Sequence, residues 1–246
     1  MTRGEPAAGG FWDPAAVPDP TVALEAQLLV FANELGSHYQ RERERAQQLS
    51  GALEDLREAY VQTVRSLSLV VEAKDAGTGA HVERGRLYGV ALLRELGVPD
   101  ENRDAEFGFL LHDAGKVGVP ERVLNKPGPL SAAEWQVMRT HPDIGYRLVG
   151  SIPFLQTAAL VVRHHHESFD GTGYPDGLSG TEIPLTARVF AVADAFDAMT
   201  TARPYRPALS TEAAVGELRR MSGSQFDPDV VCAFVALCDR LAPANR

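Results

Sequence analysis

The chain has 246 residues, of which 44% are hydrophobic, and its formal net charge is -9. This length suits one catalytic domain plus an accessory segment and excludes a crowded multidomain assembly. The negative charge argues against an extended nucleic-acid surface, because binding a polyanion requires clustered Lys and Arg residues.

Neither a membrane span nor a secretion signal is visible in the sequence. No window approaches the roughly 18 uninterrupted apolar residues of a spanning helix. The start of the chain, Met1–Glu5, lacks the basic and apolar regions of a signal peptide. Cys232 and Cys238 share an apolar stretch, which suits buried helix residues better than a disulfide framework. We therefore expect a cytoplasmic protein with no membrane contact.

The first 71 residues divide into two segments of different composition. Residues 1–20 contain Gly9-Gly10 and four prolines, which predict a flexible segment. Residues 21–71 contain no proline and predict one long helix. Along it, mainly apolar residues recur at alternate steps of four and three, here called the seam: Leu28, Ala32, Leu35, Tyr39, Glu42, Ala46, Leu49, Leu53, Leu56, Tyr60, Thr63, Leu67 and Val70.

This spacing is typical of a coiled coil. Because the chain contains a single helix of this kind, the simplest partner is the same helix of a second copy. We therefore predict a homodimer joined by a signalling helix. Packing of this helix on its own domain is the alternative.

Residues 72–246 form the predicted catalytic domain, a series of helical segments between loops rich in proline and glycine. Strand signals are scarce, so the predicted fold class is all-α. Ser131-Ala132-Ala133-Glu134 is a capping box that marks a helix start. The expected helices are Arg84–Leu96, Asn102–Lys116, Ser131–Val149, and about 153–166, 185–201, 211–221 and 227–241.

His112 and Asp113 stand side by side in an apolar run, Gly108–Lys116, that is typical of a buried helix. Burying a neutral polar group without a partner costs roughly 2 to 7 kcal/mol, and a charge costs more. A bound cation would satisfy both groups. A buried histidine that is hydrogen-bonded to a nearby aspartate is the simpler alternative for an isolated pair.

Six of the seven histidines fall within residues 81–166, which favours a metal centre over independent core histidines. With Asp113 and Asp194 they offer nitrogen and oxygen donors and no thiolate. So many donors exceed the needs of one ion and favour two divalent metals about 3.5–4 Å apart. Mixed imidazole and carboxylate ligands suit iron or manganese at least as well as zinc. The six histidines are His81, His112, His141, His164, His165 and His166.

Seven segments in order resemble the HD-GYP family, the cyclic di-GMP phosphodiesterase branch of the HD phosphohydrolases. The resemblance covers about residues 67–234. Its motifs are Ala73-Lys74-Asp75 with His81 and Glu83-Arg84; His112-Asp113-Ala114-Gly115-Lys116; Leu124-Asn125-Lys126-Pro127-Gly128; His141-Pro142; His165-His166-Glu167 with Asp170–Gly177; Ala193–Thr200; and Arg203-Pro204-Tyr205-Arg206.

The resemblance implies an HD-domain-like helical bundle with two metals. It assigns one ion to His81, His112, Asp113 and Asp194, and a second to Asp113, His141, His165 and His166. Asp113 then bridges the ions. Gly77 stands where some relatives have a glutamate that binds a third ion, so two ions are expected. His164 precedes the motif pair and is expected to be a helix or surface residue instead of a ligand.

The resemblance also assigns substrate contacts. Lys116 lies one helical turn beyond His112 and can present an ammonium to phosphate. Arg203 and Arg206 match phosphate-binding positions. The loop that carries Tyr174 contributes to substrate specificity or to a surface for a signalling partner, and the sequence does not separate these roles from a structural one.

The implied activity is hydrolysis of cyclic di-GMP to linear pGpG in bacterial signalling. Further cleavage to GMP is left open. The alternatives are a catalytically silent cyclic di-GMP receptor or adaptor, and hydrolysis of another cyclic dinucleotide or phosphoester on the same metals. Complete ligands and Lys116 argue against the receptor.

Overall fold

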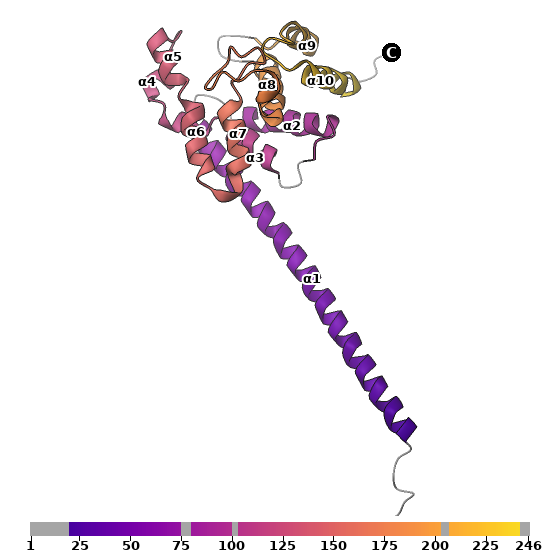
Figure 1. Cartoon of the computed structure of the whole chain (residues 1–246). Coiled ribbons are helices and arrows are strands. Elements are labelled where there is room, and N and C mark those ends of the chain that lie inside the picture. The colour runs from indigo at the N-terminus through magenta and orange to yellow at the C-terminus, as the bar shows by residue number, and fades with distance from the viewer. Residues whose placement is uncertain (1–19, 75–79, 100–102, 203–206, 242–246) are drawn as a thin grey trace, which may run out of the picture. The chain divides into compact units, whose positions relative to one another are not determined.

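The fold is described from a computed structural model of the whole chain (Figure 1). The structure describes residues 20–74, 80–99, 103–202 and 207–241. The predicted flexible segment, apart from Pro20, lies outside these residues. So do Gly77, Arg203 and Arg206, whose predicted roles the structure therefore does not address.

Helices account for the regular structure of the described residues, which contain no strand, as the all-α prediction requires. None of the described helices is long and apolar enough to cross a membrane. The elements are α1 Pro20–Glu72, α2 Ala80–Glu95, α3 Asp104–Leu111, η2 Ala114–Gly118, α4 Glu121–Leu124, α5 Ala132–Met138, α6 His141–Gly150, η3 Pro153–Leu155, α7 Gln156–His164, η4 Gly180–Glu182, α8 Leu185–Thr200, α9 Thr211–Arg220 and α10 Pro228–Leu241.

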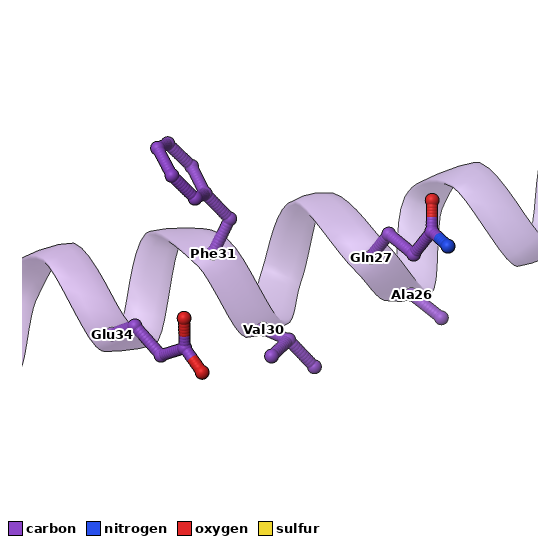
Figure 2. A pocket seen from close by; sticks show the side chains of 5 residues that line it. All are labelled: Ala26, Gln27, Val30, Phe31 and Glu34. Atoms are coloured by element: carbon purple, nitrogen blue, oxygen red, sulfur yellow. The ribbon is translucent and has the colours of Figure 1, made fainter.

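Helix α1 confirms the long helix predicted for residues 21–71. The chain divides into two compact units, residues 1–58 and 59–246. In the first unit all side chains from residue 21 onward are exposed, including the seam residues Leu28 and Leu35 at 58% and 60%. Figure 2 shows Val30 and Phe31 projecting from this stretch of α1, beside a shallow surface hollow that α1 alone lines.

The last turns of α1 belong to the second unit and pack mainly through a face other than the seam, although the seam residue Tyr60 stacks on Phe154 with centroids 4.9 Å apart. Val61, Val64 and Ser68 are buried at spacings of three and four residues. The seam residues Leu67 and Val70 remain 51% and 70% exposed. The end of α1 is therefore anchored to the second unit, while the seam residues of its last turns stay exposed among the described residues.

Helix α3 lies between two hydrophobic clusters, and all of its residues from 105 to 111 are buried. Phe109 belongs to the cluster formed with α2, α8 and α10, and its ring stacks on Phe190 with centroids 5.0 Å apart. Phe107 and Leu110 belong to the other cluster, with α7 and the end of α1. Each buried Phe or Leu contributes about 1.5–3 kcal/mol to the free energy of unfolding. This packing therefore holds the end of α3 in the interior of the unit.

Two predicted helices end earlier than the sequence suggests, and both corrections concern site residues. The helix expected over Asn102–Lys116 stops at Leu111, and His112-Asp113 forms the junction to the 3₁₀ helix η2. The helix expected over Ser131–Val149 is two helices, α5 and α6. Pro142 causes the second break, because its ring lacks an N–H for the Met138 carbonyl and clashes with it in a continuous helix.

The remaining expectations hold with smaller changes. Ser131 and Glu134 form the predicted capping box, and α8, α9 and α10 lie where the sequence places them. Helix α2 begins at Ala80, four residues before the predicted start. The segment expected as one helix over 153–166 is η3 followed by α7. Both cysteines lie on α10 and are free, but Cys232 is exposed, so the prediction that it is buried was wrong.

Gly115→Ala should destabilise the second unit. A Cβ at residue 115 would lie 1.8 Å from the His141 carbonyl oxygen and 2.5 Å from the Gly145 nitrogen, so η2 and α6 must separate. Overpacking of this kind costs about 1–3 kcal/mol or more. Chemical denaturation of the metal-free protein measures the loss.

Gly216→Ala is the matched control, because that glycine lies in α9 and a Cβ there would have nothing within 4 Å. This substitution should stabilise the unit by up to about 1 kcal/mol through helix propensity. Equal stabilities of the two variants would contradict the close approach of η2 to α6.

Candidate metal centre

The seven side chains predicted as metal ligands converge in the second unit, although they come from separated segments. His81 lies on α2 and Asp194 on α8, while His141 begins α6 and His165 follows α7. Their donor atoms form two groups, each within 4.8 Å: His81, His112 and Asp194 in one, and His141, His165 and His166 in the other.

Asp113 lies between these two groups. Its Oδ2 is 3.1 Å from His112 Nε2, and its Oδ1 is 3.3 Å from His141 Nε2. One carboxylate therefore presents one oxygen to each group. This is the arrangement in which a carboxylate can bridge two cations.

Three imidazoles are oriented by their own backbone. The Nδ1 atoms of His112, His141 and His165 lie 2.9, 2.8 and 2.9 Å from the carbonyl oxygens of the residues three positions earlier. Because a carbonyl only accepts, each Nδ1 carries the proton, and each Nε2 turns toward the site. These carbonyls belong to Phe109, Met138 and Val162, at the ends of α3, α5 and α7.

His81 is oriented by Asp197, a residue that is not among the predicted ligands or substrate contacts. Asp197 is fully buried on α8, and its Oδ2 lies 2.5 Å from His81 Nδ1. Arg84, three residues beyond His81, donates from Nε and from a terminal nitrogen to the same carboxylate. The pairing leaves His81 Nε2 facing Asp194 Oδ1 at 3.2 Å. One feature of the sequence could have indicated this pairing: Arg84 follows His81 by three residues, and Asp197 follows Asp194 by the same spacing.

The donor set fits divalent cations. His141 Nε2 and His165 Nε2 face each other at 3.5 Å, and both Nδ1 atoms carry their protons toward carbonyls, so two lone pairs point into one space. Asp194 Oδ1 is buried without a hydrogen-bond partner. Lone pairs and a carboxylate oxygen in this position are satisfied by a cation.

The two groups differ in charge. Burial lowers the pKa of His166 to about 4 and that of His165 well below its usual value, so both are neutral at pH 7. Burial also opposes a charge on His81, but the carboxylates of Asp194 and Asp197 outweigh it and raise its pKa to about 10. Burial would raise the pKa of Asp113, yet His112 and Lys116 hold it well below its usual range.

Two of the predicted substrate-binding side chains lie beside the predicted metal ligands. Lys116 Nζ lies 2.9 Å from Asp113 Oδ2, three residues away within the turn of η2 and not along a continuation of α3. The Tyr174 ring stacks on His166 with centroids 4.8 Å apart, and the Arg139 guanidinium lies 5.1 Å from its centroid. Arg203 and Arg206 lie outside the described residues.

A third group, His164, Glu167 and Asp176, holds the loop that carries Tyr174. Glu167 accepts the backbone N–H groups of Asp176 and Gly177, and Arg163 donates to both oxygens of Asp176. That guanidinium already neutralises Asp176, which disfavours a cation there. His164 ends α7 and is buried, so it is a helix residue, as expected, but not a surface residue.

Comparison with known proteins places this arrangement in a family. Residues 70–230 match the HD domain family. A cyclic di-GMP phosphodiesterase response regulator of Xanthomonas campestris, RpfG, is 40% identical over 85% of this chain and 56% of its own length. A cyclic di-GMP phosphodiesterase of Thermotoga maritima is 38% identical over 75% of this chain and 51% of its own. The chain thus spans about half the length of these relatives.

Relatives named for a different substrate are also similar. A 3'3'-cGAMP-specific phosphodiesterase 2 of Vibrio cholerae is 38% identical over 72% of this chain and 34% of its own length. The crystal structure of the V. cholerae cyclic GMP-AMP phosphodiesterase V-cGAP3 aligns with a TM-score of 0.58 at 23% identity, covering 74% of this chain and 48% of that one, which shows a shared fold. With its motifs, helices and matched residues in agreement, the chain belongs to the HD domain family.

Proposed function

We propose that the protein is a metal-dependent phosphodiesterase that hydrolyses cyclic di-GMP to linear pGpG. The observation that carries this proposal is the position of Asp113, one oxygen toward each of two groups of imidazole and carboxylate donors. The relatives named as cyclic di-GMP phosphodiesterases support the choice of substrate.

In this proposal two ions, most consistent with iron or manganese, share Asp113. His81, His112 and Asp194 complete the first set, and His141, His165 and His166 complete the second. Bound cations of this kind would make a water molecule more acidic and would offset phosphate charge. The overall reaction adds water across one phosphodiester, breaking the bond from phosphorus to the 3′ oxygen and leaving a 3′ hydroxyl and a 5′ phosphate.

Lys116 is the proposed residue for charge that develops on phosphate. Its ammonium lies 2.9 Å from Asp113, and when cations satisfy that carboxylate the ammonium is available to a phosphate oxygen. Tyr174, fixed by its stack on His166, offers an aromatic face for substrate. Arg203 and Arg206 remain predicted phosphate ligands.

The dimer is proposed on the seam of α1. Its leucines are spaced as in a coiled coil, and Leu49, Leu53 and Leu56 are 63%, 51% and 48% exposed. The α1 helix of a second copy would match this seam, because it has the same repeat and an apolar stripe of the same length.

The central experiment is turnover by anaerobically purified protein loaded with Fe²⁺ or Mn²⁺. Cyclic di-GMP and 3'3'-cGAMP are supplied separately, and products are separated by chromatography. We expect pGpG as the main product from cyclic di-GMP. Tight binding of cyclic di-GMP without any product would instead indicate a receptor. Faster cleavage of 3'3'-cGAMP would indicate that 3'3'-cGAMP is the preferred substrate.

Asp113→Asn should lower both metal content and turnover, because the amide keeps the shape of the side chain but removes the charge that faces both groups. We expect loss of at least one ion per chain and a fall in kcat of at least about 100-fold. Metal analysis and initial rates measure the two effects. Asp229→Asn, an exposed carboxylate on α10, is the control. A fully active Asp113→Asn protein would refute the bridging role.

The two ions should differ in the protons that their binding releases at pH 7. His81, with a pKa raised to about 10, is protonated in the metal-free protein and must lose that proton to become a ligand. His166, with a pKa lowered to about 4, is already neutral. Affinity at the first set should therefore increase as pH rises from 6 to 9, while affinity at the second stays nearly flat.

Calorimetric titration of the metal-free protein with Mn²⁺, in buffers of different ionisation enthalpy, counts these protons. One binding event should release about one proton or more, and the other close to none. His81→Gln should abolish the proton-releasing event and keep the other. Equal proton release at both events would contradict the difference in charge between the two groups.

Leu49→Lys with Leu56→Lys should weaken the dimer. Each leucine buried in a coiled coil contributes about 1.5–3 kcal/mol, so two charged replacements should raise the dimer Kd by at least about 100-fold. Gln47→Lys with Gln48→Lys adds the same charge on exposed positions away from the seam and should leave the Kd unchanged. Sedimentation of the full chain compares them, and an equal effect of the two pairs would rule out the seam as the interface.

A further inference from the structure

Lys74 lies just after the end of α1 and reaches the end of η2, 42 residues away in sequence. Its ammonium donates to three carbonyl oxygens, those of Lys116, Val117 and Val119, at 3.3, 2.7 and 2.9 Å. The last carbonyls of a helix have no partner within the helix, and an ammonium has three N–H donors. One lysine side chain therefore caps the 3₁₀ helix η2.

Asn125 completes the contact from the opposite direction. Its side-chain Nδ2 donates to the carbonyl oxygen of Lys74 at 3.0 Å. Asn125 is the C-cap residue of α4, which directly follows η2, and its own N–H bonds to Glu121. Lys74 is thus held at its side chain and at its backbone by one stretch of chain. We call these four hydrogen bonds the Lys74 clasp.

The other side of η2 is fixed by α6. Gly115 lies so close to the His141 carbonyl and the Gly145 nitrogen that no side chain fits between them. The segment that carries Lys116 therefore lies between α6 and the Lys74 clasp. Lys116 contributes its carbonyl to the clasp and its ammonium to Asp113, at 2.9 Å.

We propose that Lys74 is a positioning residue that couples the C-terminal end of α1 to Lys116. This inference rests on the proposed phosphodiesterase activity. A shift or rotation at the end of α1 moves the clasp and, with it, the backbone from which Lys116 projects toward Asp113. The clasp gives a role to Lys74 and Asn125. Each belongs to a sequence motif, Ala73-Lys74-Asp75 and the loop at Asn125, that supplies no predicted metal ligand.

Lys74→Met keeps the aliphatic stem and removes the three donors. The freed carbonyls are only partly buried, so water can replace the ammonium and the fold persists, but η2 loses its fixed position. A displacement of about 1 Å at a catalytic group costs up to about 100-fold in rate. We expect kcat to fall about 10-fold or more, with KM within about twofold and metal content unchanged.

Three further variants make the test specific. Lys74→Arg supplies N–H donors and should recover part of the lost kcat. Lys126→Met is the control. Lys126 directly follows Asn125, but its ammonium pairs with Glu134 on α5, at 2.6 Å, and takes no part in the clasp. Lys116→Met combined with Lys74→Met should be no slower than Lys116→Met alone, because Lys74 acts through Lys116.

Hydrogen exchange of residues 114–125 provides a readout that does not depend on activity. The Val119 N–H, which bonds to the Lys116 carbonyl, should exchange faster in Lys74→Met than in the unmodified protein. If the unmodified, metal-loaded protein turns over no cyclic dinucleotide, the proposed function fails, whatever the exchange shows. If it is active, an unchanged kcat in Lys74→Met or additive losses in the double variant overturn the proposed role of Lys74.

Discussion

The placement of a carboxylate, Asp113, between imidazoles from separate segments is the constraint on which the arrangement of the second unit depends. Removing an ion from water costs several kcal/mol even after the protein relaxes, so such a group persists only where opposite charge and hydrogen bonds surround it. Here His112 and Lys116 approach one oxygen and His141 the other. Each partner comes from a segment that the hydrophobic core holds in place: α3 lies between two clusters, and α6 packs on η2 without room for a side chain at Gly115.

Helix ends provide the orientation that a metal site needs. A helix ends with carbonyl groups that have no partner within the helix. In this protein His112, His141 and His165 donate Nδ1–H to carbonyls at the ends of α3, α5 and α7. These bonds satisfy the backbone and turn each Nε2 toward the site. His81 lies within the first turn of α2, and its Nδ1 faces the buried carboxylate of Asp197 instead of a carbonyl of the preceding helix end. The same requirement, a fixed tautomer, is thus met in two different ways.

Helix α1 serves two purposes through two faces. Val61 and Val64 anchor its last turns to the second unit, while the seam stays exposed along the described helix. The Lys74 clasp begins where α1 ends and finishes on the segment that carries Lys116. In the proposed coupling, a change at the end of the helix acts first on the ammonium beside Asp113. Four of the predicted metal ligands lie on or directly after other helices, namely His81, His141, His165 and Asp194.

The sequence by itself determined the parts that depend on local signals: the long proline-free helix, the capping box at Ser131, the all-α class, and the residue types that converge on the site. Only the tertiary structure decided how those residues are held. Helix α3 stops at Leu111 and the chain turns into η2, where Gly115 packs against α6, although residues 112–116 contain no proline that would end the helix. Asp197 and Lys74 acquire their roles from partners 116 and 42 residues away. Hydrogen bonds over such separations depend on how helices pack, which no local pattern of residues encodes.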